Sequence, residues 1–107
     1  MSNILVIDDE IDIRESIVAI LSDEGFLCDN ASNSNEAIHL IGINKYDLII
    51  LDVWLNDPDY DGMKLLKLIK KDNAKVPIII ISGHGNIDMA VEAIKEGAYE
   101  FVEKPFK

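Results

Sequence analysis

The chain contains few of the residues that disulfide-linked or membrane proteins require. Cys28 is the single cysteine among 107 residues, so no disulfide can form within the chain, which agrees with a reducing compartment. We expect Cys28 to act as a small, buried or half-buried hydrophobic residue. Apolar runs stay far below the ~20 residues that span a bilayer, and no basic region precedes an apolar stretch at the N-terminus. We therefore expect a cytoplasmic protein with no membrane segment.

Positive charge is also scarce. The chain has 10 Lys and Arg residues against 20 Asp and Glu residues, which gives a formal net charge of −10. A domain that binds nucleic acid needs a basic face for the phosphates. The charge balance therefore argues against direct nucleic acid binding by this domain.

The apolar residues form short runs that alternate with amphipathic segments. The length is that of one domain, residues 1–107, with a single hydrophobic core. We expect strands at 3–7, 26–31, 47–51, 76–81 and 98–103, with a helix between consecutive strands. The inner strands are apolar throughout, so helices must cover both faces of the sheet. The pattern predicts an α/β fold with a doubly wound, five-stranded parallel sheet.

Polar residues mark where the four helices begin and end. We expect Asp9 to cap the first helix and Ser34 or Ser32 to cap the second. Gly25 and Gly97 stand where the first and fourth helices should end. The residues expected to face the core are Ile13, Ile17, Ile20 and Leu21, then Ala37, Ile38 and Ile41, then Met63, Leu65, Leu66 and Ile69, and finally Ala90, Val91 and Ile94.

Three apolar runs end directly in polar side chains. Asp8 and Asp9 follow the first strand, Asp52 ends the third and Ser82 ends the fourth. If the first and third strands are neighbours, the three carboxylates converge, and a cation must offset their repulsion. Oxygen ligands with room for water suit Mg²⁺. With Lys104 after the last strand, the set predicts a phosphoryl-transfer site in which Asp52 is the nucleophile and forms an acyl phosphate.

The motifs at these strand ends are Asp8-Asp9-Glu10, Leu51-Asp52, Asp61-Gly62, Ser82-Gly83 and Lys104-Pro105-Phe106. Together they resemble those of response-regulator receiver domains of two-component systems, over the whole chain. The C-terminal third is similar to the nitrogen-regulation branch of that family, of NtrC/NtrX type. The resemblance implies the flavodoxin-like strand order 2-1-3-4-5. It also implies a fifth helix, which this chain lacks because it stops at Lys107.

The resemblance assigns a role to each motif residue. Asp52 accepts a phosphoryl group from a sensor histidine kinase, and Mg²⁺ is bound by Asp9 and Asp52, by Asp8 largely through water, and by the backbone carbonyl of Trp54. Ser82 and Lys104 hold the phosphoryl oxygens. Ser82 and Phe101 form the switch, although Phe101 lacks the hydroxyl of the tyrosine often found there. Trp54 and His84 line the path of the water that hydrolyses the acyl phosphate.

The resemblance also sets the expected biological context. The domain is a regulatory switch that catalyses its own Mg²⁺-dependent phosphorylation and dephosphorylation, and it is not an enzyme for another substrate. It would be the N-terminal part of a longer transcriptional regulator, controlling ATPase and DNA-binding domains, and it is compatible with a homodimer. The alternative is an interaction module that has kept the fold and works without phosphorylation. No acceptor, acidic pair or lysine is missing from the sequence, which favours the switch.

Overall fold

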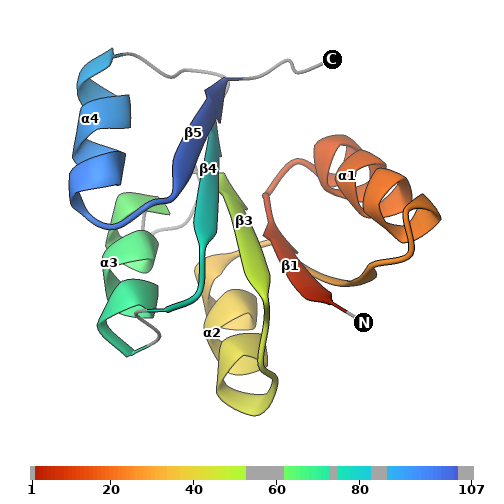
Figure 1. Ribbon diagram of the computed structural model, residues 1–107. Coiled ribbons are helices and arrows are strands. Elements are labelled where there is room, and N and C mark those ends of the chain that lie inside the picture. The colour runs from red at the N-terminus through yellow and green to blue at the C-terminus, as the bar shows by residue number, and fades with distance from the viewer. Residues whose placement is uncertain (1, 53–61, 73–74, 83–86, 104–107) are drawn as a thin grey trace.

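The computed structural model describes residues 2–52, 62–72, 75–82 and 87–103 (Figure 1). Within these ranges strands and helices alternate, as expected. The elements are β1 (Asn3–Ile7), α1 (Ile11–Asp23), β2 (Leu27–Ala31), α2 (Ser34–Ile43), β3 (Leu48–Asp52), α3 (Gly62–Asp72), β4 (Ile78–Ser82), α4 (Ile87–Lys95) and β5 (Glu100–Glu103). Each helix is the right-handed crossover that parallel strands need. The described residues contain four helices.

The five strands form one parallel sheet in the order β2-β1-β3-β4-β5, so the predicted topology is confirmed. Helix α1 lies on one face of the sheet, and α2, α3 and α4 lie on the other (Figure 1). Helices therefore lie on both faces of the sheet, which explains the continuous apolar runs of the inner strands, and Ile50 and Ile79 on the α1 face are half-buried. No helix in these ranges has both the length and the apolar character of a membrane span.

Each face of the sheet has its own hydrophobic core. Alternate side chains of a strand point to opposite faces, so neighbours in β1 belong to different cores. The core under α2, α3 and α4 is the larger, and it contains Leu5, Ile7, Ala31, Ala37, Ile49, Leu51, Leu65, Leu66, Ile69, Ile78, Ile80, Ala93 and Ala98. The core under α1 contains Ile4, Val6, Ile17 and Ile81. Cys28 is half-buried against this second core, and burial raises the pKa of its thiol, so the expected hydrophobic role is confirmed.

The predicted N-caps of α1 and α2 were wrong, whereas the predicted ends of α1 and α4 were right. The N-cap of α1 is Glu10, which makes no capping hydrogen bond through its side chain; Asp9 is not the cap. Asn33 caps α2, because its side chain accepts a 2.9 Å hydrogen bond from the Glu36 amide, in place of Ser34 or Ser32. Gly25 and Gly97 have φ values of 92° and 106°, a left-handed conformation that glycine adopts without strain.

Four residues predicted to face the core are exposed. Ile20 is 59% exposed because the buried stripe of α1 is centred on Ile17, and Ile38 lies outside the buried face of α2. In α4 the buried residue is Ala93, and Val91 and Ile94 lie in solvent. The small Ala93 side chain lets α4 approach the sheet closely, and Val91 and Ile94 are turned away from it.

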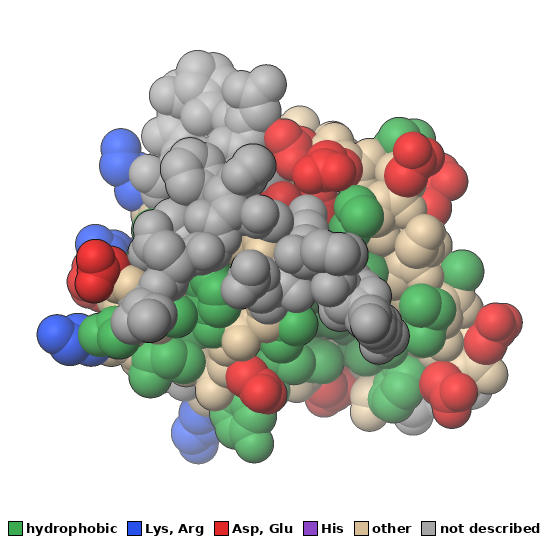
Figure 2. All heavy atoms as spheres, turned by 90° about the horizontal axis from the view of Figure 1, so that it is seen from above, with side chains coloured by type: hydrophobic (Ala, Val, Ile, Leu, Met, Phe, Trp, Pro, Cys, Tyr) green, Lys and Arg blue, Asp and Glu red, His purple; other side chains and the backbone are tan. Residues whose placement is uncertain are grey.

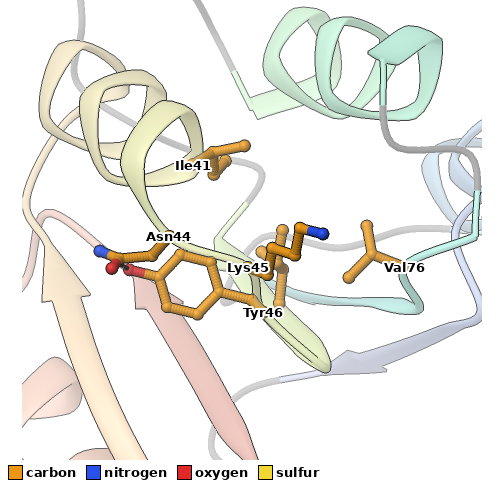
Figure 3. Close-up of a pocket in the computed structure, with 6 residues that line it drawn as sticks. Ile41, Asn44, Lys45, Tyr46 and Val76 are labelled. Atoms are coloured by element: carbon orange, nitrogen blue, oxygen red, sulfur yellow. Dashed lines mark hydrogen bonds between the residues drawn. The ribbon is translucent and has the colours of Figure 1, made fainter.

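A small pocket lies at the amino edge of the sheet, where β3 and β4 begin (Figure 3). Its volume is about 200 Å³, and it is lined by Ile41, Asn44, Lys45, Tyr46, Ile49 and Val76. The Tyr46 hydroxyl donates a 2.7 Å hydrogen bond to Asp29 Oδ2 and accepts one of 3.3 Å from Asn44 Nδ2. These bonds join the end of α2 to the edge strand β2, so the polar groups of this pocket already stabilise the fold.

Replacing Tyr46 with Phe should lower the free energy of unfolding by about 0.5–1 kcal/mol, since the hydrogen bond to Asp29 is lost at a half-buried site. Burial and the Asp29 carboxylate raise the pKa of Tyr46 to about 12, so the neutral phenol is the form that stabilises the folded state. The difference between wild type and Tyr46→Phe should therefore be present at pH 8 and disappear between pH ~10, the pKa of a free tyrosine, and pH ~12.

Urea unfolding measures this difference at each pH. Tyr99→Phe is the matched control, because Tyr99 is 73% exposed and should change stability little at any pH. An equal loss of stability in both variants at pH 8 would contradict a specific role for the Tyr46 hydroxyl.

Candidate functional site

The carboxyl ends of all five strands lie at the edge of the sheet opposite this pocket, at the top of Figure 1. Ile7 of β1 pairs with Leu51 of β3, so the next residues, Asp8 and Asp52, lie at the same level of adjacent strands. Figure 2 looks down on this edge and shows acidic side chains gathered on it. Ligands of open α/β sheets bind at such an edge.

Four carboxylates meet here. Each of Asp8, Asp9, Glu10 and Asp52 has a carboxylate oxygen within 4.8 Å of those of the other three. Asp8 and Asp52 are 0% and 2% exposed, while Asp9 and Glu10 are open to solvent. The structure therefore brings together the three aspartates named from the sequence. It adds Glu10, which sequence reasoning had quoted within a motif without assigning it to the cluster.

The backbone around Asp8 is tied to neighbouring segments. Its amide donates to the Ala31 carbonyl over 3.1 Å, which continues the β1–β2 pairing beyond the last strand residue. Its Oδ1 accepts a 2.9 Å hydrogen bond from the Glu10 amide. The second bond closes a turn between β1 and α1 and sets the direction of the Asp8 side chain.

Arg14 is a second residue near this site that sequence reasoning did not identify. It lies in the first turns of α1, and its Nη1 donates a 2.8 Å hydrogen bond to the backbone carbonyl of Asp8. Its Nε donates to Asn30 Oδ1 of β2 over 3.1 Å. Arg14 is the only arginine of the chain, and the nine lysines all lie at residue 45 or later. A single basic residue in the N-terminal part of the chain, close to the Asp8-Asp9-Glu10 motif, was the sequence signal that could have identified Arg14.

Two further predicted site residues are placed by the structure. Ser82 ends β4 and is fully buried; Asp52 pairs with the residue before it, Ile81, so Ser82 lies one position beyond Asp52 on the adjacent strand. Phe101 is half-buried in β5, opposite Ile80, and packs against the larger core. Trp54, His84 and Lys104 lie outside the described residues, and their predicted roles stay predictions.

The donor set of the cluster fits a hard divalent cation. All its side-chain ligand atoms are carboxylate oxygens, the type that Mg²⁺ and Ca²⁺ prefer, with no imidazole or thiolate of the kind zinc sites use. Two of the carboxylates are exposed, which leaves room for the waters that Mg²⁺ keeps. The residues that could hold the ion are therefore Asp8, Asp9, Asp52 and Glu10.

The fold, the acidic cluster and the sequence agree with one family. The family model for the response regulator receiver domain matches residues 4–107, and the chain belongs to this family.

Individual relatives show which branch of the family the chain resembles. The chain is 47% identical over 104 residues to the nitrogen assimilation regulatory protein NtrX of Azorhizobium caulinodans, covering 97% of this chain and 23% of that protein. It is 49% identical, again over 104 residues, to a putative NtrX-like response regulator of Rickettsia bellii, covering 97% and 22%. The resemblance to the nitrogen-regulation branch is thus confirmed.

Solved structures agree with this placement. The receiver domain of NtrX from Brucella abortus has 48% sequence identity and a TM-score of 0.92, with 97% of this chain and 87% of that chain covered. A Burkholderia pseudomallei response regulator with a phosphorylated aspartic acid, a calcium ion and citrate has 29% identity and a TM-score of 0.92, covering 100% and 62%. This chain spans less than a quarter of the length of its curated NtrX-type relatives.

Mg²⁺ should stabilise the folded domain, because a ligand that binds only the folded state adds about 2.7 kcal/mol at a hundred times its Kd. Asp9→Asn should remove most of that gain, since the remaining carboxylates supply too few ligands. The measurement is the melting temperature with Mg²⁺ and with EDTA. Asp12→Asn is the control, an exposed acid in the first turn of α1 and outside the cluster. The same Mg²⁺-induced rise in Asp9→Asn as in wild type would rule Asp9 out as a ligand.

Proposed function

We propose that this domain is a phosphorylation switch in which Asp52 accepts a phosphoryl group from a sensor histidine kinase in the presence of Mg²⁺. The observation that carries the proposal is the buried Asp52 carboxylate at the end of β3, within 4.8 Å of three other carboxylates. The burial of two carboxylates within such a cluster favours the binding of a cation. The phosphorylated aspartic acid of the Burkholderia relative supports the same chemistry here.

The transfer needs one nucleophile and a site that accepts negative charge. A carboxylate oxygen of Asp52 attacks the phosphorus of a phosphohistidine, the P–N bond breaks as the P–O bond forms, and the imidazole leaves as the neutral base after taking up a proton. Asp8, Asp9, Asp52 and the Trp54 carbonyl would hold Mg²⁺, which would supply positive charge to the phosphoryl oxygens. Burial of Asp52 fixes the direction of attack.

Hydroxyl and ammonium groups complete the proposed site. Ser82 is buried one position beyond Asp52 on the adjacent strand, and it would donate its hydroxyl proton to a phosphoryl oxygen. Lys104, which follows β5, would bind a second oxygen through its ammonium group. The added charge of about −1.5 to −2 draws Ser82 inward and leaves space into which Phe101 can turn. Because Phe101 has no hydroxyl to form a hydrogen bond, the inward and outward positions of its ring differ in energy only through packing.

The biological context rests on the relatives' length. We place residues 1–107 as the N-terminal receiver of a longer transcriptional regulator, in which the switch controls ATPase and DNA-binding domains. The supporting observation is that the chain spans 22% and 23% of its NtrX-type relatives. Within that regulator this domain acts on itself, catalysing gain and loss of its own phosphoryl group, and it binds no nucleic acid. The cytoplasmic location and the homodimer expected from the sequence stay predictions.

Incubation with acetyl phosphate and Mg²⁺ should add one phosphoryl group to the wild-type domain, read by intact mass. Asp52→Asn should add none, because an amide is not a nucleophile of comparable strength. Asp47→Asn is the matched control: Asp47 lies just before the same strand, at the opposite edge of the sheet, and bonds the Asn3 amide. An adduct of equal yield in Asp52→Asn would remove Asp52 as the acceptor. No adduct on the folded wild type would favour the interaction module instead.

The lifetime of the acyl phosphate should depend on Trp54. A large indole two residues beyond the acceptor can exclude the attacking water, and it carries no acceptor to orient one. Trp54→Asn should therefore hydrolyse about 10-fold faster, which corresponds to ~1.4 kcal/mol of barrier. His84→Ala should change the hydrolysis rate less, because His84 can act as a base only on a water molecule that Trp54 already excludes. Loss of the phosphoryl mass over time measures both rates, and a large slowing in His84→Ala would assign hydrolysis to His84.

A further inference from the structure

Arg14 makes contacts that the proposed chemistry has not used. Its guanidinium joins two strand ends, bonding the Asp8 carbonyl after β1 through Nη1 at 2.8 Å and the Asn30 side chain of β2 through Nε at 3.1 Å. Both acceptors are neutral oxygens. The planar guanidinium has donors in fixed directions, so it can hold two oxygens in a set geometry that a lysine ammonium cannot reproduce.

The carbonyl that Arg14 holds belongs to the peptide group between Asp8 and Asp9. A peptide group is planar, so fixing its oxygen fixes the orientation of both residues. The Asp8 amide is bonded to Ala31, and the Asp8 carboxylate accepts from the Glu10 amide. Arg14 therefore adds a side-chain restraint to residues 8–10, the segment that carries three of the four clustered carboxylates.

We propose that Arg14 is a positioning residue that sets the Mg²⁺ affinity of the acidic cluster by holding the Asp8–Asp9 peptide. The inference rests on the metal site of the proposed function. Mg²⁺ demands ligands at about 2.1 Å in near-ideal octahedral geometry, so a small rotation of this peptide moves two carboxylates away from productive positions. Residues that orient metal ligands commonly change metal affinity 10- to 100-fold when they are replaced.

The charge of Arg14 has the opposite effect on affinity. A cation this close to the cluster repels Mg²⁺, so removing it should tighten binding by electrostatics alone. Positioning predicts weaker binding for the same substitution. The sign of the change therefore separates the two effects.

The experiment is a calorimetric titration of Mg²⁺ into the purified domain. Arg14→Met, which keeps the length of the stem without donors, should raise the Kd about tenfold, or ~1.4 kcal/mol. Arg14→Lys keeps the charge and can bond one oxygen at a time, so its Kd should lie between those of wild type and Arg14→Met. Lys67→Met is the control for the loss of one positive charge, because Lys67 lies on another part of the surface, with its Nζ 3.9 Å from Glu96 Oε1. The Mg²⁺ Kd of Lys67→Met should differ less than twofold from that of wild type.

Unchanged or tighter Mg²⁺ binding by folded Arg14→Met would overturn the proposal. If Arg14→Met does not fold, Asn30→Ala tests the same idea, because it removes one anchor of the guanidinium and leaves its charge. We expect its Kd to rise about threefold, and a Kd equal to that of wild type would count against positioning. A wild type that neither binds Mg²⁺ nor takes up a phosphoryl group would instead refute the proposed function itself.

Discussion

The structure depends on one electrostatic constraint, the burial of two like charges at the ends of adjacent strands. Asp8 and Asp52 are almost inaccessible to solvent, and the β1–β3 register places them side by side. Two carboxylates in such a position repel each other and lose hydration, so they need hydrogen-bond donors or a cation. The parallel sheet supplies the location, and the Glu10 amide in the β1–α1 turn supplies part of the compensation through its bond to Asp8.

The two edges of the sheet serve different purposes. At the amino edge, polar contacts join one chain segment to another: Tyr46 to Asp29, the Asn3 amide to the Asp47 carboxylate, and the Leu27 amide to the Ser2 carbonyl. These bonds stabilise the fold. At the carboxyl edge, four carboxylates lie within 4.8 Å of one another, an arrangement that costs stability through charge repulsion and favours the binding of a cation. The pocket at the amino edge is therefore a structural feature, distant in the sheet from the chemistry.

Much of this fold could be predicted from the sequence, because buried parallel strands require continuous apolar runs and glycines mark helix ends. The strand order came from family resemblance, since periodicity alone does not order strands. The N-caps were wrong because several polar residues near each helix start could cap it, and only backbone geometry selects Glu10 or Asn33. Val91 and Ile94 were placed inward because the helical period does not reveal that α4 approaches the sheet through Ala93. Arg14 was missed because its acceptors, a backbone carbonyl and Asn30, are recognisable only in three dimensions.

The register between β1 and β3 limits where the chain can gain or lose residues over evolution. The side chains of a strand alternate between faces, so one residue inserted into β1 would move Asp8 by ~3.3 Å and turn it to the opposite face of the sheet. The acidic cluster would be lost although every residue type remained. Segments that lead from a helix to the next strand are under no such restriction, because their length does not alter the register of Ile7 with Leu51. We therefore expect insertions and deletions to be tolerated in the segments between a helix and the next strand and excluded from β1 and β3, whose register places Asp8 beside Asp52.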